Sequence, residues 1–523
     1  MPKWIFVTGG VLSGLGKGLV SASVSKLLQQ RDLDIVPVKC DGYLNVDPGT
    51  MNPHEHGEVF VLEDGTEVDM DFGHYERFLG VEGKGDWNLT SGKIFQEVID
   101  KERRGDYLGK TVQMVPHVTD EIKDWVGGVA DEEDADIVIV EIGGTVGDIE
   151  NQLFLEAVRQ KRSEEPENTY LIHVTLVPYL ETTGEQKTKP TQHSVKELRE
   201  LGLEPDMVVG RSDDYLGDSA QEKISLFCDV PEEAVISDPD IDTIYRLPIL
   251  FDEQNVDELI GQKLDLPDRD NGMEDWKQRV DNLKSEPVAR IAICGKYTEI
   301  DDSYVSVEEA LKHAAAELRG SVEIEQIPTE GFEEGDVDRL ERFDGVVIPG
   351  GFGSRGVEGK INIIQHCREN DVPILGLCYG LQLMVVEFAR NVLGLDAASE
   401  EFADGHEDLV IAELPEQKEV DMKGGTMRLG AYTADVKGRI AEIYGSDTAT
   451  ERHRHRYEVN PEYHEPLQEN GLEIEGWTKS GELAEYIGLD DHPFFIGTQA
   501  HPEFTSSLQN PNPLYLEFIR SCR

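Results

Sequence analysis

Short, almost uninterrupted apolar runs alternate with amphipathic segments through the first half of the chain. The runs KWIFVTGG, DIVPVKC, ADIVIVEIGG and YLIHVTLVPYL are nearly continuously apolar, which is typical of strands buried on both faces of a parallel sheet. Segments between them, such as LVSASVSKLLQQR, have the spacing of amphipathic helices. This alternation predicts an α/β fold with a doubly wound, mostly parallel sheet.

A second α/β pattern follows a polar, acidic stretch, KLDLPDRDNGMEDWKQRVDNLKSEP. Beyond it, VARIAICGKY, DGVVIPGG and PILGLC predict strands, SVEEALKHAAAEL predicts a helix, and the pattern finishes with FFIGTQAHPEF. The 523 residues also exceed what one hydrophobic core normally organises. We therefore predict two doubly wound α/β domains, at residues 1–265 and 288–523, joined by a linker at 266–287.

Negatively charged residues greatly outnumber positively charged ones in this chain. The chain has 105 Asp and Glu residues against 49 Lys and Arg residues, a formal net charge of -56, although the charged total of 29% is ordinary. Such a field repels nucleic acid and anionic membranes, so we expect neither as a partner, despite the RHRHR run at Arg452–Arg456. The balance favours adaptation to a salt-rich, halophilic cytoplasm, and an acidic mesophilic protein is the alternative.

The sequence contains no signal for export or membrane insertion. No run approaches the roughly 20 consecutive apolar residues of a membrane span, and MPKWIFVTGG leads directly into a strand pattern instead of a signal peptide. We therefore expect a cytoplasmic protein. The six cysteines have no CxxC or CxxH spacing, which argues against a disulfide framework and a structural zinc site.

The first apolar run leads into a glycine-rich turn and a helix, in WIFVTGGVLSGLGKGLVSASVSKLL. This order aims backbone N–H groups and a helix dipole at phosphate oxygens, and Lys17 supplies a cation. The string departs from GxxxxGK[ST], because five residues separate Gly10 from Gly16 and Gly18 replaces the hydroxyl residue that would contact magnesium. We predict a nucleotide phosphate site; a glycine-rich turn without a ligand is the alternative.

Carboxylates elsewhere must then hold magnesium. Asp71 in EVDMDFGHYERF and Glu141, at the end of DIVIVEIGG, are the two candidates, and Glu141 has the more apolar context. In so acidic a chain, any single acid is by default a solvated surface residue. Further along, Lys187 and Lys189 lie in GEQKTKPTQHSV, a cluster that suits a second polyphosphate; an exposed loop is the alternative.

A cysteine between two glycines follows the run PILGL. Flanking glycines permit the strained turn of a nucleophile elbow at Cys378, and the helix that follows favours a thiolate and lends N–H groups to an oxyanion. The glycine-rich turn at Gly350 and Gly351 can complete the oxyanion hole. Near the end, His501 and Glu503 share one face of an extended segment, as a general base and its orienting group do. Together these pieces indicate a class I glutamine amidotransferase domain.

Nine motif blocks run along nearly the whole chain. They are, in order, FVTGGVLSGLGKG, NVDPGTMNPHEHGEVFVLEDG, DFGHYERF, EIGGTVGDIE, KTKPTQHSV, PGGFGSRGVEGKI, GGTMRLG, ERHRHRYEVN and HPEF. In content and order they resemble the blocks of the CTP synthase family. The sequence departs from the family pattern in two ways that bear on the resemblance. The elbow reads CYGLQ, whereas a leucine and a methionine are commoner in this stretch of the family, and the chain is far more acidic than is usual for the family. Neither removes a catalytic atom.

The resemblance implies a set of site residues. The catalytic triad would be Cys378, His501 and Glu503, and magnesium would be held by Asp71 and Glu141. The implied nucleotide contacts are Ser13, Gly14, Leu15, Gly16, Lys17, Gly18, Leu19, Lys39, Asp71, Asp148, Ile149, Glu150, Lys187, Thr188, Lys189, Pro190, Thr191, Gln192 and Lys223. The implied glutamine contacts are Gly351, Tyr379, Gly380, Leu381, Gln382, Glu401 and Arg456.

The resemblance also implies an activity and its partners. Members aminate UTP to CTP with ATP as co-substrate, Mg²⁺ as cofactor and glutamine as nitrogen donor. They respond to GTP as allosteric activator and to CTP as feedback inhibitor, and they assemble as homotetramers. Two other classes stay open: an amidotransferase with another acceptor, of the cobyric-acid type, and a P-loop partitioning or switch ATPase.

Overall fold

The computed structural model describes residues 2–46, 58–267, 272–296, 301–332, 337–403, 405–413 and 427–523. The chain forms two compact units, one of Met1–Pro48 with His74–Lys277 and one of Gly49–Gly73 with Gln278–Arg523. The units divide inside the predicted linker, within helix α11 (Glu274–Asn282). Residues 49–73 group with the second unit although both flanks belong to the first, which the hydrophobic pattern did not indicate.

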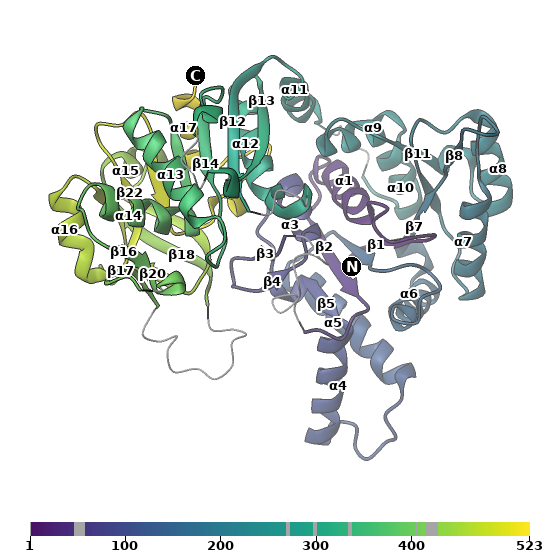
Figure 1. Cartoon of the computed structure of the whole chain (residues 1–523). Coiled ribbons are helices and arrows are strands. Elements are labelled where there is room, and N and C mark those ends of the chain that lie inside the picture. Colours follow the sequence, from purple (N-terminus) through teal and green to yellow (C-terminus); the bar gives the residue numbers. More distant parts are fainter. Residues whose placement is uncertain are drawn as a thin grey trace. The chain divides into compact units, whose positions relative to one another are not determined.

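The first unit is built on a parallel sheet of seven strands in the order β11-β10-β7-β1-β6-β2-β5. Strand β1 lies at its centre, between β6 and β7 (Figure 1). The strands are β1 (Lys3–Gly9), β2 (Ile35–Asp41), β5 (Asn88–Thr90), β6 (Ile137–Ile142), β7 (Thr169–Leu176), β10 (Met207–Ser212) and β11 (Val235–Pro239). The predicted doubly wound parallel sheet is therefore confirmed for this unit.

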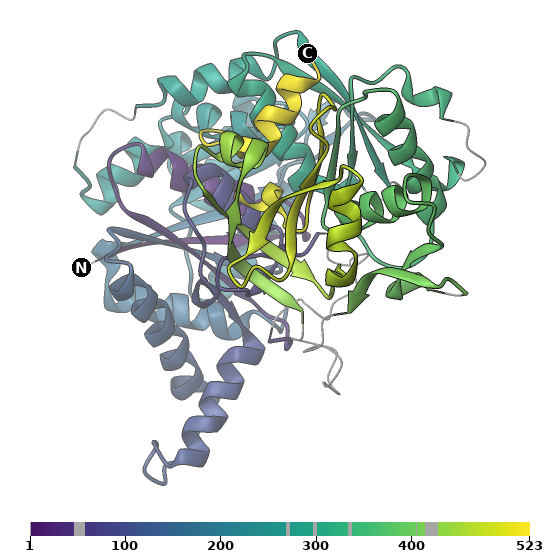
Figure 2. The same ribbon diagram turned by 90° about the vertical axis from the view of Figure 1, so that its left-hand side faces the viewer.

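Helices flank this sheet. They are α1 (Lys17–Gln29), α3 (Asp71–Leu79), α4 (Ser91–Arg104), α5 (Thr119–Glu132), α6 (Gln152–Glu164), α7 (Lys189–Glu200), α8 (Asp218–Cys228), α9 (Leu247–Glu253) and α10 (Val256–Leu264). Helix α1 packs against α9 and α10, while α5 packs against α6. Helix α4 and the loop after it project beyond the sheet in both views (Figures 1 and 2).

The second unit has a mixed sheet of nine strands, in the order β13-β12-β14-β15-β23-β22-β21-β18-β19. Pairing is parallel from β13 to β23 and antiparallel from there to β19. The strands are β12 (Pro287–Gly295), β13 (Ser321–Pro328), β14 (Gly345–Ile348), β15 (Ile374–Leu377), β18 (Arg428–Val436), β19 (Thr448–His455), β21 (Glu473–Thr478), β22 (Ala484–Gly488) and β23 (Phe495–Thr498).

Smaller elements complete the second unit. A three-stranded sheet joins β16 (Ala397–Ser399), β17 (Asp408–Glu413) and β20 (Tyr457–Val459), and a short hairpin pairs β3 (Phe60–Val61) with β4 (Glu67–Val68). The helices are α12 (Val305–Glu317), α13 (Val357–Glu369), α14 (Tyr379–Asn391), α15 (Gly438–Tyr444), α16 (His464–Glu469) and α17 (Pro513–Ser521).

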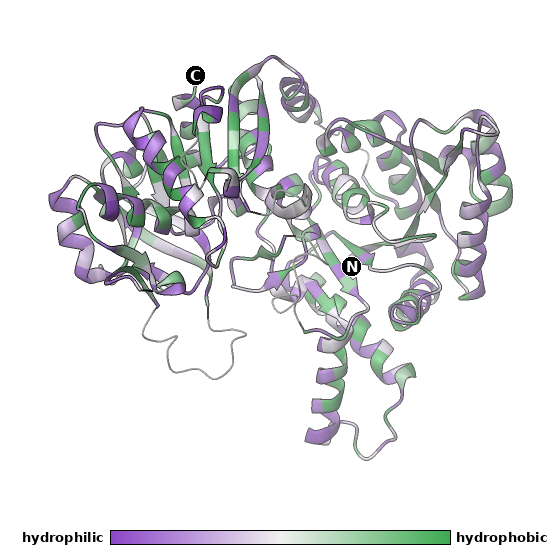
Figure 3. Cartoon of the chain, in the orientation of Figure 1, coloured by the Kyte–Doolittle hydropathy of each residue, from purple (hydrophilic) through white to green (hydrophobic). Residues whose placement is uncertain are grey.

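The core of the second unit lies in two apolar layers. One layer joins the strands to α13 and α14, and the other joins them to α12, α15 and α17. The strands of both large sheets are coloured mostly as hydrophobic in Figure 3. Burial of apolar area on both faces of a sheet is the main favourable term for such a fold. Within the described ranges, no helix combines the length and apolar character needed to cross a membrane.

Candidate functional site

The glycine-rich loop of the first unit lies at the carboxyl end of the central strand. Strand β1 ends at Gly9 and α1 begins at Lys17. Gly16, with φ of 89°, adopts the left-handed conformation that glycine permits. A Cβ on Gly10 would lie 1.5 Å from Oγ of Ser194, so only glycine fits there. The first turn of α1 has no side-chain cap, and its N–H groups can bind an anion.

Lys17 is held at the mouth of this loop. Its Nζ donates to the carbonyl oxygen of Gly144, 2.9 Å away, in the turn that follows β6. The other predicted contacts of this motif, Ser13 to Leu19, lie in the loop and the first turn of α1. A cation and a row of N–H groups thus meet at one sheet edge, where a nucleotide's phosphates can bind.

A buried polar chain lies beneath the loop and was not predicted from the sequence. His173 on β7 bonds Oγ1 of Thr8 through Nδ1, at 2.9 Å, and Oγ of Ser194 through Nε2, at 2.7 Å. Burial and the nearby Lys17 lower the pKa of His173 to about 3, so the ring is neutral. These hydrogen bonds link β1 through β7 to α7, the helix that begins in the KTKPTQ block.

Glu141 lies at the end of β6, fully buried, next to the phosphate loop. It accepts a short hydrogen bond from the hydroxyl of Tyr75, and Nζ of Lys39 lies 3.5 Å from its Oε1. Strand pairing sets Lys39 directly opposite Glu141. The structure therefore brings together the predicted phosphate lysine and one predicted magnesium ligand.

The residues present fit a magnesium ion that keeps most of its water. No three His, Cys, Asp or Glu side chains in the described part of the chain form a metal-binding group by themselves. Mg²⁺ needs only one or two protein carboxylates beside the phosphates, and Glu141 is a buried carboxylate at the loop. Asp71 opens α3 within the stretch that groups with the second unit, so its part in this site stays a prediction.

The remaining predicted nucleotide contacts lie in three places of the first unit. Asp148 to Glu150 form the turn after β6, where Ile149 is 80% exposed and Oδ2 of Asp148 accepts from the N–H of Thr145. The KTKPTQ block opens α7, with Nζ of Lys189 donating to Gln192 at 2.9 Å. Gln192 in turn donates to Oγ1 of Thr188. Lys223 lies on α8.

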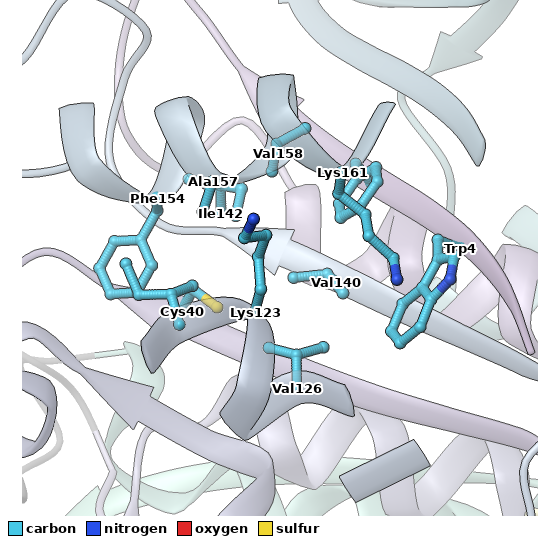
Figure 4. A pocket seen from close by; sticks show the side chains of 12 residues that line it. Trp4, Cys40, Lys123, Val126, Val140, Ile142, Phe154, Ala157, Val158 and Lys161 are labelled. Carbon is cyan, nitrogen blue, oxygen red and sulfur yellow. The ribbon is translucent and has the colours of Figure 1, made fainter. Parts of the chain in front are cut away.

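A small apolar cavity lies elsewhere in this unit, between β1, β2 and β6 and the helices α5 and α6 (Figure 4). Trp4, Cys40 and Phe154 line it, and the side chains of Lys123 and Lys161 lie along it. Its volume is about 30 Å³, which is room for a water molecule and not for a nucleotide. We interpret it as a packing gap in the core.

Cys378 in the second unit occupies a strained turn between β15 and α14. Its φ of 51° and ψ of -99° are unusual for a residue with a side chain. Gly380 must be glycine, because a Cβ there would lie 2.2 Å from the carbonyl oxygen of Ile348. The backbone N–H of Cys378 donates to Thr498 on the neighbouring strand β23, at 2.7 Å. This is the geometry of a nucleophile elbow.

His501 and Glu503 lie as the sequence predicted. Nδ1 of His501 is 2.7 Å from Oε1 of Glu503, and both side chains are buried. Burial opposes protonation of His501, but Glu503 and Cys378 outweigh it and raise the pKa of His501 to about 10. A protonated imidazole between a carboxylate and a thiol is the charge pattern of a Cys-His-Glu triad.

A glycine-rich loop faces this triad. A Cβ on Gly350 would lie 2.9 Å from Cε1 of His501, so the loop approaches as closely as glycine allows. The hydroxyl of Tyr379 donates to the carbonyl oxygen of Gly353 at 2.6 Å, and the N–H of Gly353 donates to Glu401 at 2.8 Å. Tyr379 and Glu401, both predicted glutamine contacts, thereby fix the loop that carries Gly351.

The other predicted glutamine contacts also lie in the second unit, on α14 and near Glu401. Gln382 on α14 donates through Nε2 to the carbonyl oxygen of Tyr457, at 2.9 Å. Burial raises the pKa of Glu401, although the N–H of Gly353 and the cations Lys296 and Arg456 oppose the shift. Arg456 therefore acts on Glu401 electrostatically. Gly380 and Leu381 form the first turn of α14.

Sequence reasoning missed Gln499, which lies next to Cys378, the predicted nucleophile. Its Nε2 donates to Sγ of Cys378 at 3.7 Å, and its side chain is completely buried. The residue stands two positions before His501 in the same block, QAHPEF. An amide near a catalytic pair is a weak signal by itself, because a buried Gln usually serves packing.

Comparisons with known proteins assign a family model to each of two regions of the chain. The family model described as CTP synthase N-terminus matches residues 3–266, and that of glutamine amidotransferase class-I matches residues 299–521. Together the two models cover most of the chain.

Curated relatives resemble the chain from end to end. CTP synthase of Archaeoglobus fulgidus is 53% identical, over 99% of this chain and 98% of its own length. The CTP synthases of Caldanaerobacter subterraneus and Methanocaldococcus jannaschii are 52% and 51% identical over 100% and 99% of this chain, and 98% of their own lengths. Similarity of this extent establishes that the chain, with the two sites described above, belongs to the CTP synthase family of glutamine-hydrolysing ligases.

Proposed function

We propose that this chain aminates UTP to CTP, with ATP as co-substrate and glutamine as the source of nitrogen. The observation that carries the proposal is the presence, in one chain, of a phosphate loop with Lys17 and a cysteine elbow supported by His501 and Glu503. Similarity to the family over the whole chain supports the same reaction.

The nucleotide chemistry belongs to the first unit. The loop at Ser13–Leu19 and Lys17 hold the phosphates of ATP, and the KTKPTQ block with Lys223 holds the triphosphate of UTP. Transfer of the terminal phosphoryl group of ATP to O4 of UTP makes that oxygen a leaving group. Bound Mg²⁺, held by Asp71 and Glu141, would offset the phosphate charge.

Glutamine hydrolysis belongs to the second unit. The Cys378 thiolate attacks the amide carbon, backbone N–H groups near Gly351 bind the oxyanion, and His501 gives its proton to the leaving nitrogen. Water then releases glutamate from the thioester, with His501 as base and Glu503 orienting it. The ammonia passes internally to C4 of the activated UTP and displaces phosphate.

Regulation and assembly follow the family resemblance. We propose that CTP binds at Asp148 to Glu150 as feedback inhibitor, that GTP activates glutamine hydrolysis, and that the protein works as a cytoplasmic homotetramer. Four large apolar side chains on α4 and the segment after it are exposed and are available for subunit contacts: Ile99 58%, Leu108 89%, Met114 56% and Val115 45% exposed.

The alternatives explain less of the molecule. An amidotransferase with another acceptor has no use for the KTKPTQ cluster, and a P-loop switch ATPase has no use for a fused Cys-His-Glu unit. Incubation with UTP, ATP, Mg²⁺ and amide-¹⁵N glutamine, with and without GTP, tests the proposal. We expect ¹⁵N in CTP and faster transfer with GTP. Release of labelled ammonia without labelled CTP would contradict the UTP assignment.

A further inference from the structure

A hairpin from the amino-terminal half of the chain packs beside the glutamine site. We call residues Glu58–Val68, which contain β3 and β4, the 58–68 hairpin. The chain before Gly49 and after Gly73 belongs to the nucleotide unit, yet the hairpin groups with the second unit. Neither its sequence nor its length marks it as part of the amidotransferase.

The strand under this hairpin, β19, contacts both main catalytic residues through its backbone. The N–H of His501 donates to the carbonyl oxygen of Arg452 at 2.8 Å. Sγ of Cys378 lies 3.9 Å from the carbonyl oxygen of Arg454. The position of two carbonyl groups on β19, two residues apart, therefore sets how Cys378 and His501 are placed relative to one another.

The same two arginines hold the hairpin with their side chains, which share one face of β19. Nη1 of Arg452 donates to the carbonyl oxygen of Val61 at 3.1 Å, and its guanidinium lies 5.5 Å from the centre of the Phe60 ring. Nε of Arg454 donates to Oε1 of Glu67 at 2.7 Å. The Glu67 side chain is 9% exposed, so this charge-assisted bond is largely shielded from water.

An aromatic path makes a second link. The Phe60 ring meets the Phe504 ring edge-on at 4.9 Å between centroids, and Phe504 stacks on the His501 ring at 5.3 Å and 19°. Backbone contacts fix the hairpin from other sides: the N–H of Ala431 donates to Glu63, and the N–H of Ser306 donates to the Glu58 carboxylate.

We propose that Phe60 and Glu67 are positioning residues for glutamine hydrolysis, which hold β19 and Phe504 so that Cys378 and His501 stay aligned. The proposal deepens the function proposed above and rests on it. Small misalignment of a nucleophile and its base is enough to slow the chemistry, by up to about 100-fold for a displacement of about 1 Å. A hairpin from the amino-terminal half of the chain thereby supports the site of glutamine hydrolysis.

The test compares Glu67→Gln and Phe60→Leu with Asp64→Asn in the full-length protein. Asp64 lies at the exposed tip of the same hairpin, and an Asn oxygen can still accept from the N–H of Thr66. We expect Glu67→Gln and Phe60→Leu to lower kcat for glutamine hydrolysis about 10-fold with KM for glutamine changed less than about 2-fold. Synthesis from added ammonia stays within about 2-fold, and Asp64→Asn behaves as wild type.

A substrate-free readout separates this proposal from the proposed function. The rate at which iodoacetamide alkylates Cys378, followed by peptide mass mapping across a pH series, should fall in both hairpin variants at neutral pH. If Phe60 and Glu67 had only a structural role, the two substitutions would lower the melting temperature and leave the alkylation rate of Cys378 unchanged. Wild-type alkylation and kcat in both variants, or equal loss of the ammonia-dependent rate, would overturn the proposal. If Glu67→Gln does not fold, Phe60→Leu decides.

Discussion

At the scale of single residues, Cys378 combines a strained backbone with a paired histidine. Its positive φ persists because the flanking glycines and the N–H bond to Thr498 fix the turn. We predict that Cys378→Ala reduces glutamine-dependent CTP formation at least about 1,000-fold and leaves ammonia-dependent synthesis nearly intact, because the thiol only releases nitrogen. Parallel assays with glutamine and with ammonium chloride measure this. Equal loss of both rates would contradict two separate sites.

Substitution of Lys17, unlike that of Cys378, should affect synthesis from both nitrogen sources. Its Nζ bonds Gly144 at the phosphate loop, so Lys17→Ala removes the cation that the loop presents. We expect both the glutamine-dependent and the ammonia-dependent rates to fall, by about 100-fold or more, because UTP must be activated whatever the nitrogen source. Glutaminase activity measured alone serves as the internal control for folding. Normal ammonia-dependent turnover would remove this loop as the ATP site.

Lys360 on α13 is a buried lysine whose Nζ lies 5.1 Å from the centre of the Tyr379 ring. Its side chain is completely buried, and its Nζ has no hydrogen-bond partner among the described residues. Burial, helped by Lys296, lowers the pKa of Lys360 from 10.5 to about 7. Between these values the unfolded state binds more protons than the folded state, so the free energy of unfolding rises with pH across that window.

We therefore predict that Lys360→Met stabilises the protein, by up to a few kcal/mol at neutral pH and below, with the gain shrinking towards about pH 10. Met nearly matches the apolar stem of Lys and carries no charge. Denaturation curves of the variant and the wild type, from about pH 6 to about pH 9, measure the difference. A gain that does not depend on pH would mean that Lys360 stays charged in the folded state.

At the scale of elements, close packing of α14 on β14 depends on Gly380. A Cβ there would lie 2.2 Å from a backbone oxygen of β14, and backbone cannot move aside cheaply. We predict that Gly380→Ala destabilises the second unit by about 2 kcal/mol or more and abolishes glutamine use. The matched control is Gly127→Ala in α5, where no atom lies within 4 Å of the new Cβ.

In that control, alanine should raise helix stability by up to about 1 kcal/mol, since glycine is the poorer helix former. Thermal unfolding of the two variants under one buffer condition compares them. Equal effects of the two substitutions would contradict the packing argument, because only one of them meets a steric barrier.

At the scale of the whole molecule, the net charge of -56 makes electrostatic repulsion the main feature that depends on salt. Repulsion extends over a Debye length of roughly 30 Å at about 0.01 M salt but only about 3 Å at about 1 M. We predict that lowering KCl dissociates the proposed homotetramer and reduces activity before secondary structure is lost, because association brings like charges together while each core keeps its apolar burial. Sedimentation and circular dichroism across a KCl series test this. Full assembly and activity in dilute buffer would contradict a halophilic adaptation.

Much of the fold and the local chemistry could be predicted from the sequence. Continuous apolar runs identified the buried parallel strands, since strands covered on both faces have no polar side. Glycine spacing located the turn between β1 and α1 and the turn at Cys378, because glycine permits such backbone conformations and close approaches. The family membership and the enzyme class, predicted from ordered motif blocks, are confirmed by the whole-chain similarity.

What the sequence could not determine depends on partners far apart in the chain. The pairing of His173 with Ser194, the contact of Gln499 with Cys378, and the hold of Glu67 on Arg454 each require a folded backbone to exist. The grouping of residues 49–73 with the second unit is of the same kind. Local propensity and periodicity describe near neighbours in sequence, and they therefore specify strands, helices and turns. Only tertiary packing decides which distant side chains meet, because burial and hydrogen bonding are satisfied in three dimensions.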